Sequence, residues 1–265
     1  SGINHMAWLL EISRNGGGLY PIIRKRAQEG PIYAPTLALR ELHPEYADRI
    51  PSVAEQFTPD NHHDMVRFEI MKQFGYFVTE SSEHSSEYYP WFIKKDHPEL
   101  IDRFHIPLDE YPRRCRDQIA RWKQQAEHLV HNENLTHTRS SEYAAGIIEA
   151  LETGRTFGFA GNVLNTGLID NLPFDACVEV SCMVNEGHLS PCHMGPLPNQ
   201  LAALNRRQIE VHQLTVDAAL TRKKEYIYQA AMLDPHAGSE LTIDEIRSLV
   251  DDLIQAHGDW LPEYH

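Results

Sequence analysis

The sequence predicts an α+β fold: one helix-rich domain over residues 1–265, with a small mixed sheet. Apolar residues alternate strictly over 178–184, which is the period of a strand with one buried face. Over 246–254 they recur every three or four positions, which is typical of an amphipathic helix packed on a core. Helical patterns dominate elsewhere, without repeats or low-complexity tracts, so we expect helices grouped beside one sheet.

The first part of the chain gives the weakest structural signal. An apolar start over 1–13 stops at Asn15 and three glycines over 16–18, which predict a flexible break. Prolines then recur through 19–60, so short helices and loops are expected there.

Clearer elements follow in the middle of the chain. The polar run 61–64 can cap a helix that Gly75 ends. Residues 76–79 are apolar and aromatic enough for a short strand. From 109 to about 131 a long polar helix is predicted, with its few apolar side chains on one stripe.

Helices also dominate the second half. A serine at 140–141 caps a helix that Gly154 ends, and one long helix is expected from 200 to 232. Thr242 and Glu245 have the spacing of a capping box, which predicts the start of the last helix.

Composition limits the possible partners. The net charge of −14 argues against nucleic acid or an anionic membrane as the main partner, because phosphate binding favours a basic surface. No apolar stretch approaches the roughly 18 residues that span a bilayer. The four cysteines form no CxxC pair and no disulfide scaffold, which predicts reduced thiols and a cytoplasmic protein.

The first segment that can carry chemistry is 2–8, GINHMAW, where a polar Asn4-His5 pair directly precedes an apolar run. Asn and His are costly in apolar surroundings unless they are hydrogen-bonded or bound to a ligand. His5 can bind a metal through one ring nitrogen while the other is held by an acceptor. A purely structural, hydrogen-bonded histidine is the alternative.

The second segment, 76–92, combines carboxylates, a histidine and hydroxyls with an aromatic cluster. Glu80, Glu83, His84 and Tyr88 can all transfer protons when burial and neighbours tune their pKa. Aromatic surfaces beside polar groups also suit sugar binding. The alternative is a solvated loop that its aromatic residues anchor to the core.

The third segment, 162–173, is rich in asparagine. Asn165 and Asn171 are candidates for hydrogen bonds to ligand hydroxyls, since asparagine serves both turns and binding sites. A simple turn is the alternative.

Together these segments resemble family 4 glycoside hydrolases, the NAD- and manganese-dependent group. Within that family, TESSEH and EYYPWF look most like the α-galactosidase (melibiase) branch. The resemblance covers nearly the whole chain and is least clear over 20–60. The matching segments are GINHMAW (2–8), GYFVTESSEHSSEYYPWF (75–92), NTGLIDNLPFDACVEV (165–180), GPLPNQLAALNRRQIEVHQLTVDAAL (195–220), MLDPHAGSELTIDEI (232–246) and HGDWLP (257–262).

The resemblance implies hydrolysis of α-galactosides by an unusual route, outside the two-carboxylate scheme of most glycosidases. In this family NAD oxidises the sugar at C3, a base removes the C2 proton with help from Mn²⁺ or another divalent metal, and the aglycone is eliminated. The partner is therefore a small carbohydrate. His5 resembles the metal ligand, and the base is expected among Glu80, Glu83, His84 and Tyr88.

The resemblance also implies a substrate-binding role for Asn4, Asn165 and Asn171. The family's glycine-rich NAD loop has no counterpart here, since the sequence contains no GxGxxG. None of the four cysteines matches the position of the family's cysteine metal ligand. We therefore expect the C-terminal portion of such an enzyme, without its NAD-binding domain and inactive alone. It would form a homo-oligomer or associate with the missing N-terminal half.

Two alternatives stay open. The chain can be a non-catalytic sugar-binding or oligomerisation module that kept the fold. It can also perform the same chemistry on an α-galacturonide or an α-glucoside.

Overall fold

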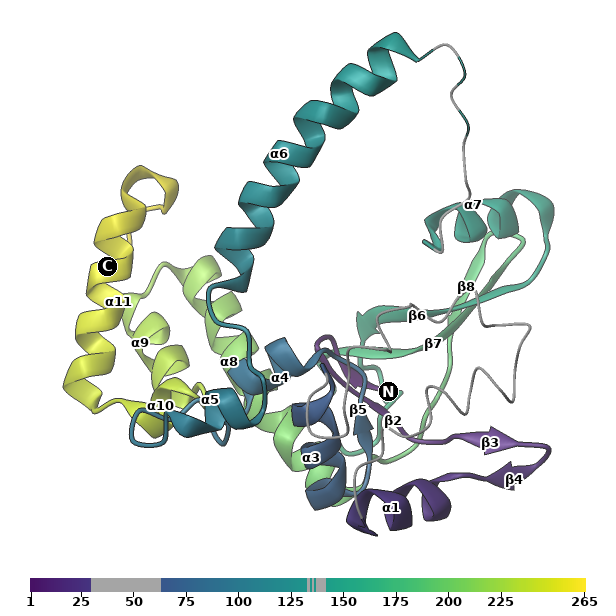
Figure 1. The fold of residues 1–265 in the computed structure, drawn as a ribbon, viewed down its shortest axis with the longest axis horizontal. Helices are drawn as coiled ribbons and strands as arrows, with labels where there is room; N and C mark the ends of the chain where they lie inside the picture. The colour runs from purple at the N-terminus through teal and green to yellow at the C-terminus, as the bar shows by residue number, and fades with distance from the viewer. Residues whose placement is uncertain (30–62, 133, 135, 137–141) are drawn as a thin grey trace.

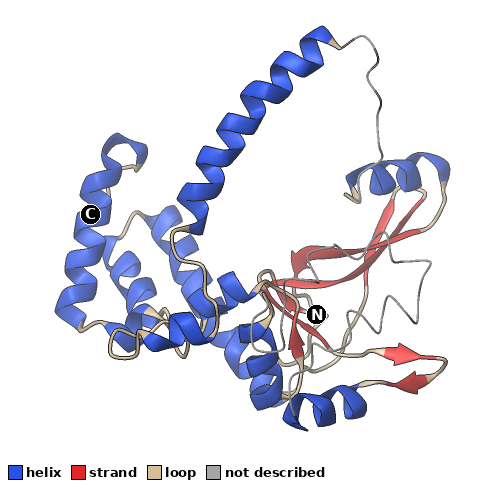
Figure 2. Ribbon diagram, viewed as in Figure 1, coloured by secondary structure: helices blue, strands red, loops and turns tan. Residues whose placement is uncertain are grey.

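The computed structural model describes residues 1–29, 63–132, 134, 136 and 142–265. Most helices gather on one side of the molecule and the strands on the other (Figure 2), which confirms the α+β class. Among the described residues, no helix combines the length and the apolar character needed to cross a membrane.

The elements follow the chain in the order shown in Figure 1. The helices are α1 (Tyr20–Glu29), α3 (Met65–Phe74), α4 (Ser82–Tyr88), α5 (Glu99–Arg103), α6 (Glu110–His131), α7 (Ala144–Thr153), α8 (Asn199–Thr221), α9 (Lys224–Leu233), α10 (Ala237–Glu240), α11 (Ile243–His257) and the 3₁₀ turn η3 (Gly258–Trp260). The strands are β1 (Gly2–Ile3), β2 (Met6–Leu9), β3 (Ser13–Arg14), β4 (Gly17–Gly18), β5 (Phe77–Val78), β6 (Phe157–Leu164), β7 (Cys177–Asn185) and β8 (His188–Pro191).

The main sheet runs in the order β5-β2-β1-β7-β6, and β8 pairs with β7. All the ladders between these strands are antiparallel. The alternation over 178–184 is confirmed, because Val178, Val180, Cys182 and Val184 are all buried on one face of β7. The hairpin of β1 and β2 joins the rest of the sheet through pairs at Gly2–Glu179 and Trp8–Val78.

The helices were predicted accurately where the sequence carried a clear apolar period or a capping box. α6 matches the predicted long polar helix, and α11 begins with the predicted capping box. The single helix expected over 200–232 is wrong: α8 ends at Thr221, Arg222 takes a left-handed φ of 62°, and α9 starts at Lys224.

Three other elements differ from the predictions. The glycines over 16–18 belong to a small hairpin, β3–β4, whose turn residues Asn15 and Gly16 both have positive φ, as such tight turns require. Strand β6 and helix α4 were not predicted from the sequence. The predicted break is therefore a structured turn.

Two predicted caps are not made as expected. Residues 61–62 and 140–141 lie outside the described residues. Asp64 occupies the N-cap of α3 without a side-chain cap bond and pairs instead with Arg67 at 2.9 Å. Tyr143 occupies the N-cap of α7.

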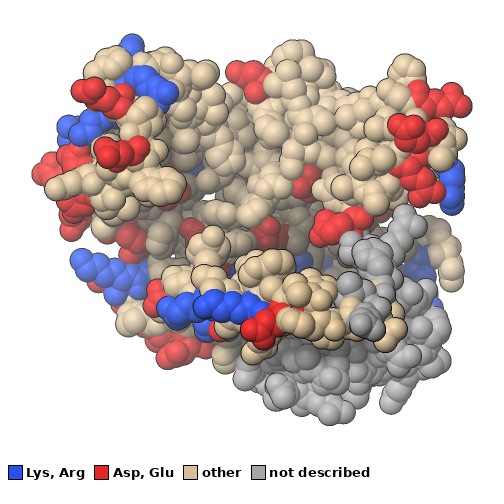
Figure 3. Space-filling view, turned by 90° about the horizontal axis from the view of Figure 1, so that it is seen from above, with Lys and Arg blue, Asp and Glu red and all other residues tan. Residues whose placement is uncertain are grey.

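Helix α6 projects away from the rest of the chain (Figure 1) and buries none of its residues. Its apolar stripe is solvent-exposed, with Trp122 at 60%. On the face in Figure 3, acidic and basic side chains are interspersed, mainly around the rim.

Candidate functional site

His5 lies at the tip of the β1–β2 hairpin. Ile3 pairs with Met6, so Asn4 and His5 form a two-residue turn. His5 takes a φ of 63°, a region that few non-glycine residues adopt, and such strain tends to collect at functional sites. The hairpin also needs Gly2, because a Cβ there would lie 2.6 Å from the Met6 carbonyl oxygen.

Helix α4 brings Tyr88 to this turn. Its serines Ser82, Ser85 and Ser86 are buried, so this face packs inward and the opposite face turns towards solvent. Ser81 caps the helix by accepting the His84 backbone N–H at 3.3 Å. The Tyr88 hydroxyl therefore comes within 3.0 Å of His5 Nδ1.

Glu80 completes the immediate surroundings of His5. One of its carboxylate oxygens lies 3.6 Å from His5 Nδ1, and the other accepts the Ser81 backbone N–H at 2.7 Å. Burial raises the pKa of the Tyr88 hydroxyl, and the nearby charges of Glu87 and Glu80 raise it further. His5 itself is 43% exposed and so accessible to a ligand.

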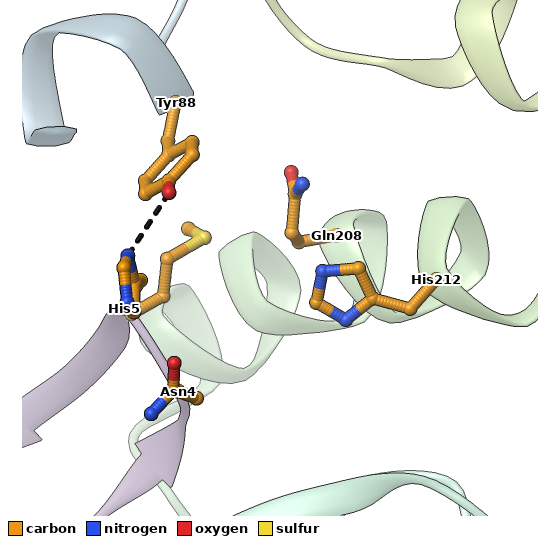
Figure 4. A pocket seen from close by; sticks show the side chains of 6 residues that line it. Asn4, His5, Tyr88, Gln208 and His212 are labelled. Carbon is orange, nitrogen blue, oxygen red and sulfur yellow. Dashed lines mark hydrogen bonds between the residues drawn. The ribbon is translucent and has the colours of Figure 1, made fainter. Parts of the chain in front are cut away.

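These residues open onto a pocket of about 240 Å³. Figure 4 shows His5 and Tyr88 on one side of it and Gln208 and His212 on α8 at the other. Partial desolvation lowers the pKa of His212. The residues that line the pocket are Asn4, His5, Met6, Tyr88, Gln208 and His212.

The sequence analysis missed Gln208 and His212, although a signal was present. With Asn205 they form a polar strip at positions i, i+3 and i+7 of α8, a helix whose neighbours Leu201, Ala202 and Ile209 are buried. Polar residues spaced along the inner face of a helix are expensive unless they serve bonds or ligands.

Asn205 fastens α8 to the hairpin that carries His5. Its side chain is fully buried, accepts the Trp8 indole N–H at 2.9 Å and donates to the Met6 carbonyl at 2.8 Å. Both sides of the pocket are therefore joined by two buried hydrogen bonds.

Two of the predicted proton-transfer residues face elsewhere. Glu83 pairs with Arg114 at 3.7 Å, and His84 Nδ1 pairs with Glu87 at 3.1 Å. Both line a second cavity of about 470 Å³ between α4 and the start of α6. The His84 ring still lies 5.2 Å from that of His5, centroid to centroid.

The side chains of Asn165 and Asn171, which were predicted to contact the substrate, bond the backbone of the chain itself. Asn165 is fully buried, and its side chain bonds the backbone of Ile169, Leu172 and Pro173. Both amide atoms of Asn171 bond the backbone of Leu197. Their amides are therefore used to fasten a loop.

Asn4, by contrast, lies at the pocket. Its side-chain nitrogen is 3.5 Å from a carboxylate oxygen of Glu179, which β7 brings beside β1. Glu179 was not predicted as a site residue, because it lies off the buried face of its strand.

The donor set fits part of a metal shell. Nδ1 of His5 is engaged by Tyr88, which leaves Nε2 as the ring nitrogen for a metal. Within the described ranges, no three His, Cys, Asp or Glu side chains are grouped to hold an ion. His5 therefore fits as one ligand of a metal whose other ligands come from elsewhere.

Comparison with known proteins shows which family the chain belongs to. Residues 1–237 match the family model described as the family 4 glycosyl hydrolase C-terminal domain. The chain belongs to glycosyl hydrolase family 4. An α-galactosidase of Bacillus subtilis (strain 168) is 54% identical over 264 residues, covering 100% of the chain and 55% of that protein.

Other family 4 proteins are more distant. An α-galactosidase of Rhizobium meliloti (strain 1021) is 30% identical, covering 100% of the chain and 50% of the relative. The chain thus spans about half the length of these curated relatives. A 6-phospho-α-glucosidase structure from gut microorganisms, in complex with NAD and Mn²⁺, has a TM-score of 0.63 at 21% identity, covering 100% of the chain and 56% of that structure. At this identity the likeness shows the fold.

Proposed function

We propose that this chain supplies the substrate- and metal-binding half of an α-galactosidase. The observation that carries the proposal is His5, held in a strained turn beside Tyr88 and Glu80, in a domain 54% identical along its whole length to an α-galactosidase.

The roles of the residues follow from their positions. His5 binds a divalent metal through Nε2 while Tyr88 orients its ring through Nδ1. Such a cation, when bound, stabilises negative charge on the substrate as a Lewis acid. Tyr88 is the best-placed group to exchange a proton with the substrate, because its hydroxyl borders the pocket. Burial raises its pKa and favours the neutral phenol, so a role as base would require the bound cation to lower that pKa.

Glu80 has a supporting role in this proposal. One of its carboxylate oxygens accepts a hydrogen bond from the Ser81 N–H. The other oxygen lies 3.6 Å from His5 Nδ1 and places a carboxylate beside the imidazole. Glu83 and His84 are occupied by ion pairs that face the second cavity, so we leave them out of the proton transfer.

The described residues do not fit NAD. Their strands pair antiparallel, and the sequence contains no GxGxxG motif of a dinucleotide phosphate loop. Dinucleotide binding therefore needs residues other than these, and we assign no NAD contact to this chain.

The test uses the complete protein with NAD and Mn²⁺. We expect hydrolysis of a nitrophenyl α-galactoside and incorporation of solvent deuterium at C2 of the sugar. His5→Ala should abolish turnover and weaken Mn²⁺ binding measured by electron paramagnetic resonance. His193→Ala is the matched control, because His193 pairs with Asp170 outside this pocket.

Two results would contradict the proposal. The first is α-galactoside hydrolysis that needs neither NAD nor metal. The second is sugar binding without any hydrolysis, which would favour the non-catalytic module.

We also propose that the chain associates with a second copy. Apolar side chains on α6, α8 and α11 remain exposed, among them Ile119, Leu220 and Leu253. Where such side chains form one contiguous apolar surface, that surface is typical of an interface with another chain. Sedimentation of the complete protein should give a dimer or larger species, and a stable monomer would contradict this.

A further inference from the structure

Gln208 is the unexplained residue of the pocket. It is only 9% exposed, and its side-chain oxygen Oε1 finds no hydrogen-bond partner among the described residues. Figure 4 shows the side chain rising from α8 into the space between Tyr88 and His212. A buried amide oxygen without a partner is rare in folded proteins, because losing its water costs free energy.

The position of Gln208 is fixed by its neighbours. One turn before it, Asn205 bonds both Trp8 and the Met6 carbonyl, so α8 cannot slide relative to the hairpin. Ile209, the next residue, is 2% exposed and anchors the helix in the core. The unpartnered oxygen is therefore held in place across the pocket from His5.

The chemistry of an amide oxygen restricts what can satisfy it. It accepts hydrogen bonds and donates none, so its partner must present an O–H or N–H group. A phosphate dianion or a carboxylate presents only acceptors. Moreover, the described residues that line this pocket include no Lys or Arg to neutralise such an anion.

We propose that Gln208 is a specificity-determining residue whose Oε1 accepts a hydrogen bond from a hydroxyl of the bound sugar. The proposal rests on the function proposed above and deepens it. The pocket selects a neutral hexoside over a phosphorylated or uronic sugar, because its described lining offers no Lys or Arg to neutralise an anionic group.

The first experiment compares Gln208→Met with the wild-type complete protein. Methionine has a similar length and shape but cannot accept a strong hydrogen bond. We expect kcat/KM for a nitrophenyl α-galactoside to fall by about ten- to hundredfold. The matched control is Gln213→Met on the same helix, whose side chain bonds Asp175 instead.

The second experiment identifies the hydroxyl. Galactose and its 2-, 3-, 4- and 6-deoxy derivatives are tested as competitive inhibitors of both proteins. In the wild type, one deoxy sugar should bind about tenfold more weakly than galactose. In Gln208→Met that difference should disappear, because the interaction is already absent.

A third measurement separates binding from folding. Replacing a buried unpartnered oxygen by an apolar group should leave the thermal midpoint unchanged or raise it. A loss of affinity with a lower midpoint would mean that Gln208 is structural, and would overturn the proposal.

The other possible outcomes of these experiments also test the proposal. Equal losses for all deoxy sugars in both proteins, or an unchanged kcat/KM in Gln208→Met, would overturn the role of Gln208 while leaving the α-galactosidase proposal intact. If the wild type hydrolyses a 6-phosphorylated or uronic galactoside better than the neutral one, the inferred selectivity is wrong. If it hydrolyses no galactoside at all, the proposed function fails first.

Discussion

The bonds made by Asn205 predict a large effect of a single substitution on stability. Asn205→Leu keeps the approximate shape of the side chain but removes both its donor and its acceptor. Two buried groups then lose a bond: the indole N–H of Trp8, which is 1% exposed, loses its acceptor, and the carbonyl of Met6, which is 2% exposed, keeps only its bond within the β1–β2 hairpin. Neither can reach water without opening the β1–β2 hairpin.

The magnitude follows from the cost of an unsatisfied buried group, about 1–3 kcal/mol each. The unpaired indole N–H and the lost bond to the Met6 carbonyl, at about 1 kcal/mol, together give a loss of about 3 kcal/mol in the free energy of unfolding. At 1.4 kcal/mol per decade, this lowers the folding equilibrium constant by about a hundredfold. We expect the same variant to raise KM, since α8 carries Gln208 and His212.

Urea unfolding followed by tryptophan fluorescence measures the change, with Trp8→Phe as the partner in a double-mutant cycle. The cycle should give a coupling of about 1 kcal/mol or more, because the two residues share one hydrogen bond. A loss below about 0.5 kcal/mol with an unchanged m-value, or a coupling near zero, would refute the reasoning.

Three other predictions are independent of this pair. Gly2→Ala should destabilise the chain by roughly 3 kcal/mol, because the new Cβ meets the Met6 carbonyl at a φ of 155°; calorimetry showing an unchanged midpoint would contradict this. Burial raises the pKa of the Tyr89 hydroxyl, so the folded state favours its protonated form and stability should fall as the pH rises above 10. In an alkaline titration the tyrosinate absorbance of Tyr89 should therefore appear together with unfolding. Ionisation of Tyr89 while the chain is still folded would contradict this prediction. Hydrogen bonds from the Lys94 side chain and the Lys95 backbone lower the pKa of Glu240, at the end of α10, to about 2. The contact of Lys94 and Lys95 with α10 should therefore be fully present above pH 4.5 and be lost as the pH falls towards 2; a Glu240 carboxyl resonance that titrates near 4.5 by nuclear magnetic resonance would contradict this.

The sequence predicted elements whose apolar residues follow one clear period. Strand β7, helix α6 and the capped start of α11 belong to this group, and each is correct to within a few residues. Helix α4 was missed because its buried face consists of serines, which carry no hydrophobic signal. The break at Arg222 was missed because a left-handed residue other than glycine leaves no local signature.

The candidate site was predictable only in part, for a related reason. His5 and the segment around Tyr88 were found from local composition and from the family resemblance. Gln208 was not found, because its importance depends on its place opposite His5 across the pocket. No local sequence pattern shows which residues face each other in the folded chain. The side chain of Asn165 bonds its own loop, a use that the sequence could not distinguish from substrate binding because binding loops and self-bonded turns use the same residue type.

The pairing of the β1–β2 hairpin has a consequence for folding. Its two strands join β5 and β7, which lie far along the chain from residues 2–9, so the centre of the sheet forms only after long loops close. The turn that carries His5 therefore reaches its final position late in folding, after the strands that pair with it have formed. Partly folded forms of the chain would keep several helices but have no pocket, and ligand binding would report the fully folded molecule.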